Sequence, residues 1–80
     1  MSPLERLIRD SYGRMVSRLT CRGVPLEDAE DAVSRALQAA LEHWPVDGVP
    51  THPVAWLATV ARNDWIDRRR RSQAAARILE

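Results

Sequence analysis

Eighty residues are enough for one small domain, because a chain of this length cannot bury the apolar area that two separate cores need. The formal net charge of +1 excludes a protein that binds polyanions over its whole surface, although all twelve basic residues are arginines. Arginine can donate two parallel hydrogen bonds to a phosphate or carboxylate, but a GC-rich coding sequence would also explain why arginine is used in place of lysine. The arginine excess follows residue 61 and the acidic residues cluster at 27–31, so the sequence predicts a molecule with separate basic and acidic regions.

The single cysteine, Cys21, excludes an internal disulfide bond and offers no zinc-finger spacing. It lies on an otherwise helical run, where we expect a half-buried small residue. No apolar run approaches the roughly 20 residues of a membrane span, and no signal peptide is evident. These features fit a protein of the reducing cytoplasm that does not bind a membrane.

The first predicted helix begins at a capping box, in which Ser2 is the N-cap, Pro3 the first helical residue and Glu5 the reciprocal partner. Apolar side chains then recur at spacings of three and four residues as far as Leu19, which predicts an amphipathic helix of about five turns. Gly23 is expected to end this helix in a left-handed conformation.

The second helix is predicted to run from about Leu26 to Trp44, with Pro45 as its stop. Acidic residues in its first turns suit the positive end of the helix dipole. Its outward positions are mostly short or polar, which is compatible either with a plain solvated face or with a surface for a partner.

A connection rich in proline follows, from Trp44 to Pro53, and we expect a shaped loop of about eight residues. A helix-turn-helix motif uses three or four residues between its helices, so this predicted length argues against that motif.

The third helix is predicted to start at Pro53, with an apolar front and a run of four arginines, Arg68 to Arg71, at its tail. We expect i,i+4 ion pairs of Asp64 with Arg68 and of Asp67 with Arg71, and fraying beyond about Ser72.

The three tryptophans differ in their expected surroundings. Trp44 and Trp56 are expected in the core, whereas Trp65 is equally compatible with core and surface. An exposed aromatic ring beside arginines is suited to phosphates and unstacked bases, so Trp65 is a candidate for contact with nucleic acid.

The reactive side chains form no recognisable catalytic or metal site. Cys21, His43 and His52 lie on separate predicted elements, whereas zinc ligands normally come in pairs at short spacing. There is no Ser-His-acid arrangement, no glycine-rich phosphate loop and no nucleophile motif. We therefore expect no enzyme, no metal and no cofactor.

The order of short motifs along the chain is more specific than any of them alone. In sequence they are Ala29-Glu30-Asp31, a proline-rich loop, Ala55-Trp56-Leu57, Ala61-Arg62-Asn63 and Asp67-Arg68. Over residues 10–71 this order resembles region 2 of the extracytoplasmic-function (ECF) sigma factors of bacterial RNA polymerase, within the sigma-70 family. The resemblance implies an all-α three-helix bundle over residues 1–71, with residues 72–80 as a tail or the start of a linker to a region 4 that this chain lacks.

The resemblance also implies two binding surfaces. The family's second helix docks on the coiled coil of the polymerase beta-prime subunit, and the matching positions here are Glu30, Asp31, Ser34, Arg35 and Gln38. The family's loop and third helix hold the non-template single strand of the minus-ten promoter element. The matching positions here, to which we add Trp65, are Asp47, Gly48, Val49, Thr51, His52, Thr59, Arg62, Asn63, Arg68, Arg69, Arg70 and Arg71. If four arginines contact phosphate, the log–log salt slope of binding should be about −3.

The sequence departs from the family pattern in two places. Ser34 and Arg35 replace the usual Gln and Glu of the second helix, and Asp64 and Arg69 occupy positions that are often apolar. These departures, with the missing region 4, leave an alternative open, namely a sigma-like module that binds polymerase or an anti-sigma factor without reading DNA. The missing region 4 is compatible with an excised domain or with a partner that supplies it. A generic binder of double-stranded DNA would require tight duplex binding, and the long loop argues against it.

Overall fold

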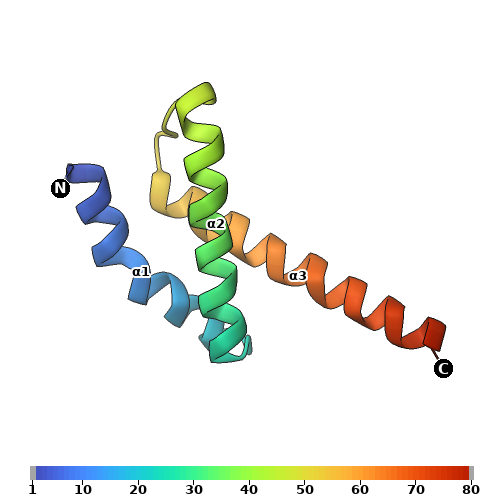
Figure 1. The fold of residues 1–80 in the computed structure, drawn as a ribbon. Helices are drawn as coiled ribbons and strands as arrows, with labels where there is room; N and C mark the ends of the chain where they lie inside the picture. Colours follow the sequence, from blue (N-terminus) through green and yellow to red (C-terminus); the bar gives the residue numbers. More distant parts are fainter. Residues whose placement is uncertain (1, 80) are drawn as a thin grey trace.

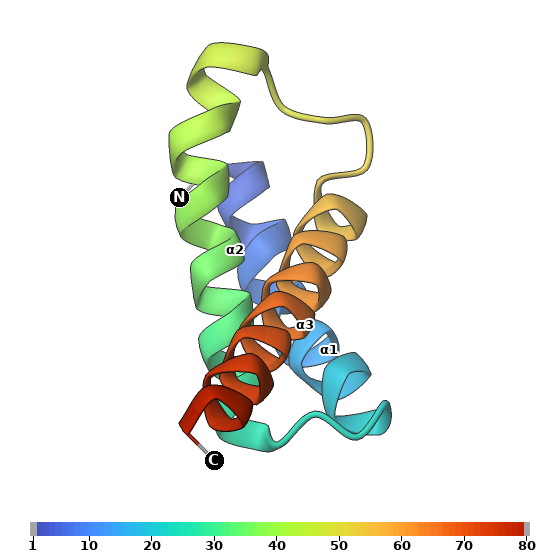
Figure 2. The same cartoon turned by 90° about the vertical axis from the view of Figure 1, so that its right-hand side faces the viewer.

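The computed structural model describes residues 2–79, which form three α-helices and no strand (Figure 1). The helices are α1 (Pro3–Cys21), α2 (Leu26–Asp47) and α3 (Pro53–Leu79). α2 packs against both other helices, and α3 continues beyond them as a long arm (Figures 1 and 2). The predicted all-α, three-helix class is therefore confirmed.

Both ends of α1 lie where the sequence predicts them, and the Ser2 half of the predicted capping box is present. The Ser2 hydroxyl oxygen accepts a hydrogen bond from the Glu5 backbone N–H at 3.2 Å, and Pro3 is the first helical residue. At the other end Gly23 has φ +92°, which a residue with a side chain adopts only with strain. The Gly23 N–H donates to the Thr20 carbonyl, and the next N–H donates to the Leu19 carbonyl. This Schellman arrangement turns the chain towards α2.

The predicted end of the second helix was wrong, because α2 continues through Pro45 to Asp47. A proline there removes one helical hydrogen bond, to the carbonyl of Leu41, and Leu41 is exposed, so water can replace the lost donor. The helix ends at Gly48, which has φ +89° and donates its N–H to the Trp44 carbonyl at 2.9 Å. The connection is thus residues 48–52, shorter than expected but still one residue longer than the three or four of a helix-turn-helix.

The predicted fraying beyond Ser72 was also wrong, since α3 is continuous to Leu79. Residues 72–79 contain three alanines together with Gln73 and Arg77, which are good helix formers, and neither glycine nor proline interrupts them. Although α3 has 27 residues, neither it nor any other helix within residues 2–79 combines the length and apolarity needed to cross a membrane. Residues 72–78 are exposed and belong to the arm seen in Figure 1.

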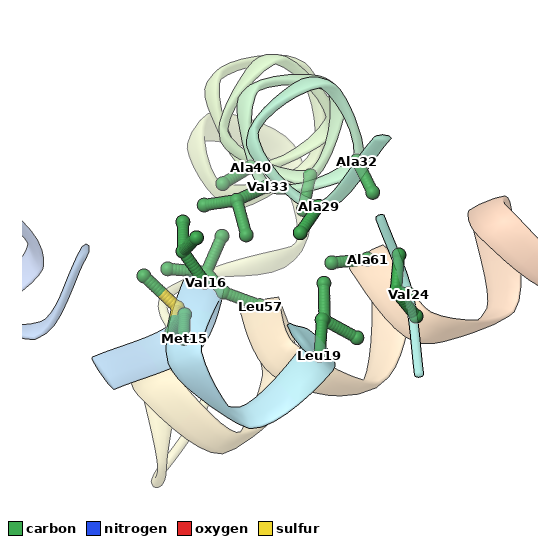
Figure 3. Packing of buried hydrophobic residues seen from close by; sticks show 11 residues of the cluster. Met15, Val16, Leu19, Val24, Ala29, Ala32, Val33, Ala40, Leu57 and Ala61 are labelled. Atoms are coloured by element: carbon green, nitrogen blue, oxygen red, sulfur yellow. The ribbon is translucent and has the colours of Figure 1, made fainter. Parts of the chain in front are cut away.

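The core lies where the three helices meet, and Leu57 of α3 is at its centre (Figure 3). Leu57, Met15 and Val33 are the largest fully buried side chains, and most other α2 positions in the core are alanines. Small side chains allow the helix backbones to approach closely. Cys21 is exposed rather than half-buried, because it lies about 200° around α1 from the buried Leu19.

Trp44 and Trp56 connect the end of α2 to the start of α3. Both are half-buried against the core, as predicted, and their rings meet edge to face with centroids 5.3 Å apart and an interplanar angle of 63°. Such pairs add about 0.5–1.5 kcal/mol beyond the area they bury. The pair fixes the two helix ends between which residues 48–52 must run.

Candidate nucleic-acid interface

The connection between α2 and α3 is held outside the core. The site residues predicted in the loop are all exposed to solvent. They are Asp47, which the structure places at the end of α2, and Gly48, Val49, Thr51 and His52 of the connection. Only Pro50 is half-buried within the connection, and Asp47 lies 3.9 Å from the ring of His43 in an exposed i,i+4 pair. The structure therefore gathers the predicted loop residues at one accessible end of the bundle.

The first predicted site residues of α3 lie on its solvent-exposed side, called here its outer face, part of which borders a cleft with α1. Thr59, Arg62 and Asn63 are exposed, while Leu57 and Ala61, on the opposite side of the helix, are fully buried. The spacings of three and four residues bring the three exposed side chains together. Within residues 2–79, Arg62 makes no ion pair, so its charge is available to a ligand.

The four consecutive arginines, Arg68 to Arg71, differ in whether they contact other residues of the domain. Arg68 donates from Nε to both carboxylate oxygens of Asp64, at 3.2 and 3.3 Å, which confirms the expected i,i+4 pair. Arg69 lies over the Trp65 ring, 5.3 Å from its centroid, in a cation–π contact. Both side chains are therefore engaged inside the domain.

Arg70 and Arg71, by contrast, are exposed and form no ion pair in the part of the chain that the structure describes. The predicted pair of Asp67 with Arg71 was wrong, because the carboxylate lies within ion-pair distance of no described cation. An exposed i,i+4 pair contributes only about 0.3–0.5 kcal/mol, so nothing forces these side chains together. Two of the four arginines remain available to phosphate.

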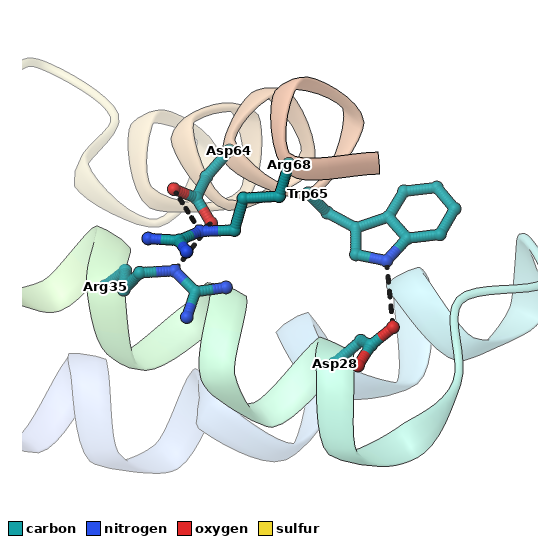
Figure 4. Close-up of polar contacts among 5 residues, drawn as sticks. All are labelled: Asp28, Arg35, Asp64, Trp65 and Arg68. Carbon is teal, nitrogen blue, oxygen red and sulfur yellow. Dashed lines mark hydrogen bonds and ion pairs between the residues drawn. The ribbon is translucent and has the colours of Figure 1, made fainter. Parts of the chain in front are cut away.

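Trp65 lies between core and surface. It is half-buried, and its indole N–H donates to Asp28 Oδ2 at 3.3 Å, which links α3 to the first turn of α2 (Figure 4). With one ring face towards Arg69, the indole serves first as a bridge within the domain. A base could stack on it only by displacing that guanidinium group.

The predicted polymerase-binding face of α2 is exposed at four of its five positions, namely Glu30, Asp31, Ser34 and Gln38. Arg35 differs, because its side chain is half-buried and turned towards α3. Its Nε donates to Asp64 Oδ2 at 2.7 Å (Figure 4). Arg35 therefore adds no free charge to this face.

The two main departures from the resembled pattern thus contact each other. Arg35 replaces an acidic residue and Asp64 an apolar one, and together they form an ion pair between α2 and α3. Arg68 approaches the same carboxylate, so one acid holds two guanidinium groups. No local spacing signals this contact, because the residues are 29 positions apart.

A double-mutant cycle of Arg35→Ala and Asp64→Ala is expected to give a coupling free energy of about 0.5–1 kcal/mol in urea unfolding. The side chains are only 30% and 25% exposed, so water screens their attraction less than that of a surface pair. The matched control is the His43→Ala and Asp47→Ala cycle, whose partners are 60% and 71% exposed and should couple near zero. Equal coupling free energies in both cycles would show that the Arg35–Asp64 pair stabilises the domain no more than an exposed pair does.

Sequence reasoning missed two arginines at the end of α1. A cleft of about 270 Å³ between α1 and α3 brings Arg18 and Arg22 next to Thr59 and Arg62, with Met15 in its lining. The i,i+4 spacing of Arg18 and Arg22 was visible in the sequence, but their position opposite Arg62 depends on how the helices cross.

Histidine and cysteine form no cluster around this interface. Within residues 2–79, no three side chains of the metal-ligating types lie close enough together to hold an ion. His43 and His52 are exposed near the connection, and Cys21 is exposed on α1. The absence of catalysis stays a prediction from the sequence.

Comparison with known proteins identifies the family to which this three-helix chain belongs. The family model of sigma-70 region 2 matches residues 7–75, which include nearly all of α1, all of α2 and most of α3. An uncharacterized protein of Rhizobium meliloti (strain 1021), R00370, is 48% identical over 46 residues, which are 58% of this chain but only 11% of that protein. No solved structure matches significantly. Because the family model covers well over half of the sequence, the chain belongs to the sigma-70 region 2 family.

Proposed function

We propose that this chain is region 2 of an ECF sigma factor, which binds core RNA polymerase and holds the non-template strand of the minus-ten promoter element during transcription initiation. Membership of the sigma-70 region 2 family supports the general role. The observation that carries the DNA-binding part is the exposed connection 48–52, which leads directly into α3, together with the exposed arginines of that helix that form no ion pair within residues 2–79.

The interface suits an unwound strand because it offers different groups to bases and to phosphates. Asn63 presents an exposed amide that can donate to and accept from a base edge, and the exposed connection 48–52 precedes the same helix. Arg62, Arg70 and Arg71 present free guanidinium groups to the backbone. Opening base pairs is costly, and holding an extruded base recovers part of that cost.

The polymerase contact is assigned to the exposed face of α2. Glu30 and Asp31 present negative charge near its start, and Ser34 and Gln38 continue the face as neutral polar groups. This surface lies on a different helix from the arginines, so one domain can contact the beta-prime coiled coil and DNA together. The protein acts without catalysis, in the cytoplasm, where the polymerase is.

A module that binds polymerase or an anti-sigma factor without reading DNA is the second candidate. The observation that favours it is the Arg35–Asp64 pair. Arg35 stands on α2 where the resembled pattern has an acidic residue, and Asp64 also holds Arg68 of the cationic end of α3. On this view the remaining acids of α2 would serve a protein partner, and the free arginines would be ordinary solvated residues.

The deciding experiment titrates labelled single strands carrying minus-ten libraries, and the matching duplexes, with the 80-residue chain, alongside capture by the beta-prime coiled coil. We expect the single strand to bind at least about tenfold more tightly than the duplex, because only the single strand offers unstacked bases. The three free arginines of α3 predict a log–log salt slope of about −2, smaller in magnitude than the value expected from four arginines. Capture by the coiled coil without DNA binding would instead establish the interaction module.

A further inference from the structure

The last turns of α1 carry a row of arginines that the proposed function does not use. Arg14, Arg18 and Arg22 follow one another at spacings of four residues, so their Cα atoms lie about 6 Å apart along one side of the helix. All three side chains are exposed. Arg62 of α3 faces this row across the cleft of about 270 Å³ that Arg18 and Arg22 line.

No acidic side chain belongs to this surface in the part of the chain that the structure describes. Besides the cleft, a shallow hollow on α1 is lined by all three arginines of the row, and a second one by Arg22 and Arg62 beside Trp65. None of the three hollows has an aspartate or glutamate in its lining, and none of the four arginines forms an ion pair with another residue of the range 2–79. By contrast, Arg35 and Arg68 of the same domain both contact Asp64.

Guanidinium groups that share a surface with no acidic group in contact repel one another, which costs stability in the unbound domain. Cations in the last turn of a helix interact favourably with its dipole, which would account for Arg18 and Arg22 but not for Arg62, which approaches from another helix. An anionic ligand removes the repulsion and accepts forked hydrogen bonds from arginine. A row of charges along a helix matches an extended polyanion better than a single ion.

We propose that Arg14, Arg18, Arg22 and Arg62 form a phosphate track that binds the backbone of the single DNA strand beyond the part held by the connection. This inference rests on the proposed function and extends its interface from α3 to α1. Figure 2 shows the connection, in yellow, and the end of α1, in blue-green, at opposite ends of the same side of the bundle. Thr59 and Arg62 on α3 lie in the cleft beside that end of α1.

The test compares two double variants of α1 that remove the same charge. Arg18→Gln/Arg22→Gln removes two members of the track, and Arg6→Gln/Arg9→Gln removes two exposed arginines from the other end of the helix. The probe is a labelled single strand of about 15 nucleotides, longer than a single contact site. If the track adds Arg14, Arg18 and Arg22 to the three arginines of α3, the wild-type slope on this longer probe should be about −4 rather than −2. We expect the track variant to bind about tenfold more weakly and its salt slope to fall in magnitude by about 1.4, while the control variant keeps the wild-type slope.

A second arm replaces single phosphates of the probe with neutral methylphosphonate linkages. Linkages that weaken binding of the wild-type chain should lose their effect in the track variant, because the arginines that contacted them are gone. Circular dichroism melts should show both variants folded, with the track variant no less stable than the control.

The outcomes separate this inference from the proposed function. If wild-type chain binds the strand but the track variant binds equally well, the phosphate track is refuted and the α3 interface stands. Equal weakening of both variants would mean a general charge effect and would also refute the track. If the wild-type chain binds no single strand but binds polyglutamate through Arg18 and Arg22, the surface is a protein contact and both proposals fail.

Discussion

Replacing Leu57 with alanine is expected to lower the free energy of unfolding by about 2–5 kcal/mol. Leu57 is fully buried where α3 meets α1 and α2, and few other large side chains fill this centre (Figure 3). A domain of this length has a total stability of about 4–12 kcal/mol, so the substitution would remove a large part of it. Urea unfolding followed by circular dichroism measures the change.

Leu41→Ala is the matched control, because the chemical change is the same but the Leu41 side chain is 77% exposed. Surface substitutions of this kind usually change stability by less than about 0.5 kcal/mol. A similar loss in both variants would mean that Leu57 is not central to the packing, and that the position of α3 has another cause.

Features set by neighbouring residues were predictable from the sequence. The Ser2 cap and the left-handed turn at Gly23 depend on residues within one helical turn, and the structure has both. The three-helix class followed from the apolar periodicity and from the family resemblance. Local signals thus identified the elements and placed both caps of the first helix.

Two predicted helix ends, those of α2 and α3, were wrong because a general rule was applied where the local surroundings permit the helix to continue. Pro45 is a helix breaker in a helix interior, but in the last turn of α2 it removes one hydrogen bond from a carbonyl on an exposed residue. The fraying expected beyond Ser72 neglected the helix propensity of the three alanines that follow.

Contacts between distant residues were beyond sequence reasoning. Arg35 pairs with Asp64 across two helices, and Arg22 shares a cleft with Arg62, and neither relation has a sequence spacing that would reveal it. The predicted site residues are consequently of two kinds. The connection and the outer face of α3 are exposed as expected, whereas Arg35, Trp65, Arg68 and Arg69 have partners within the domain.

This division predicts that the four consecutive arginines are not equivalent. Arg70→Gln/Arg71→Gln is expected to weaken single-strand binding by about ten- to thirtyfold and to lower the magnitude of the salt slope by about 1.4, because both side chains are free to contact phosphate. Unfolding in urea should be nearly unchanged, since no described contact is lost.

Arg68→Gln/Arg69→Gln removes the same charge from adjacent positions, so it controls for the effect of net charge at this end of α3. This variant loses the hydrogen bonds to Asp64 and the cation–π contact with Trp65, and we expect a stability loss of about 0.5–1.5 kcal/mol. Its binding should weaken less than that of the Arg70/Arg71 variant, because its side chains contact the domain in the absence of DNA. If the two variants bound equally weakly, net charge alone would govern affinity, and the separation of the run into supporting and ligand-binding arginines would be wrong. If only the Arg70/Arg71 variant loses binding while remaining fully stable, the free end of the run is the part that meets the strand.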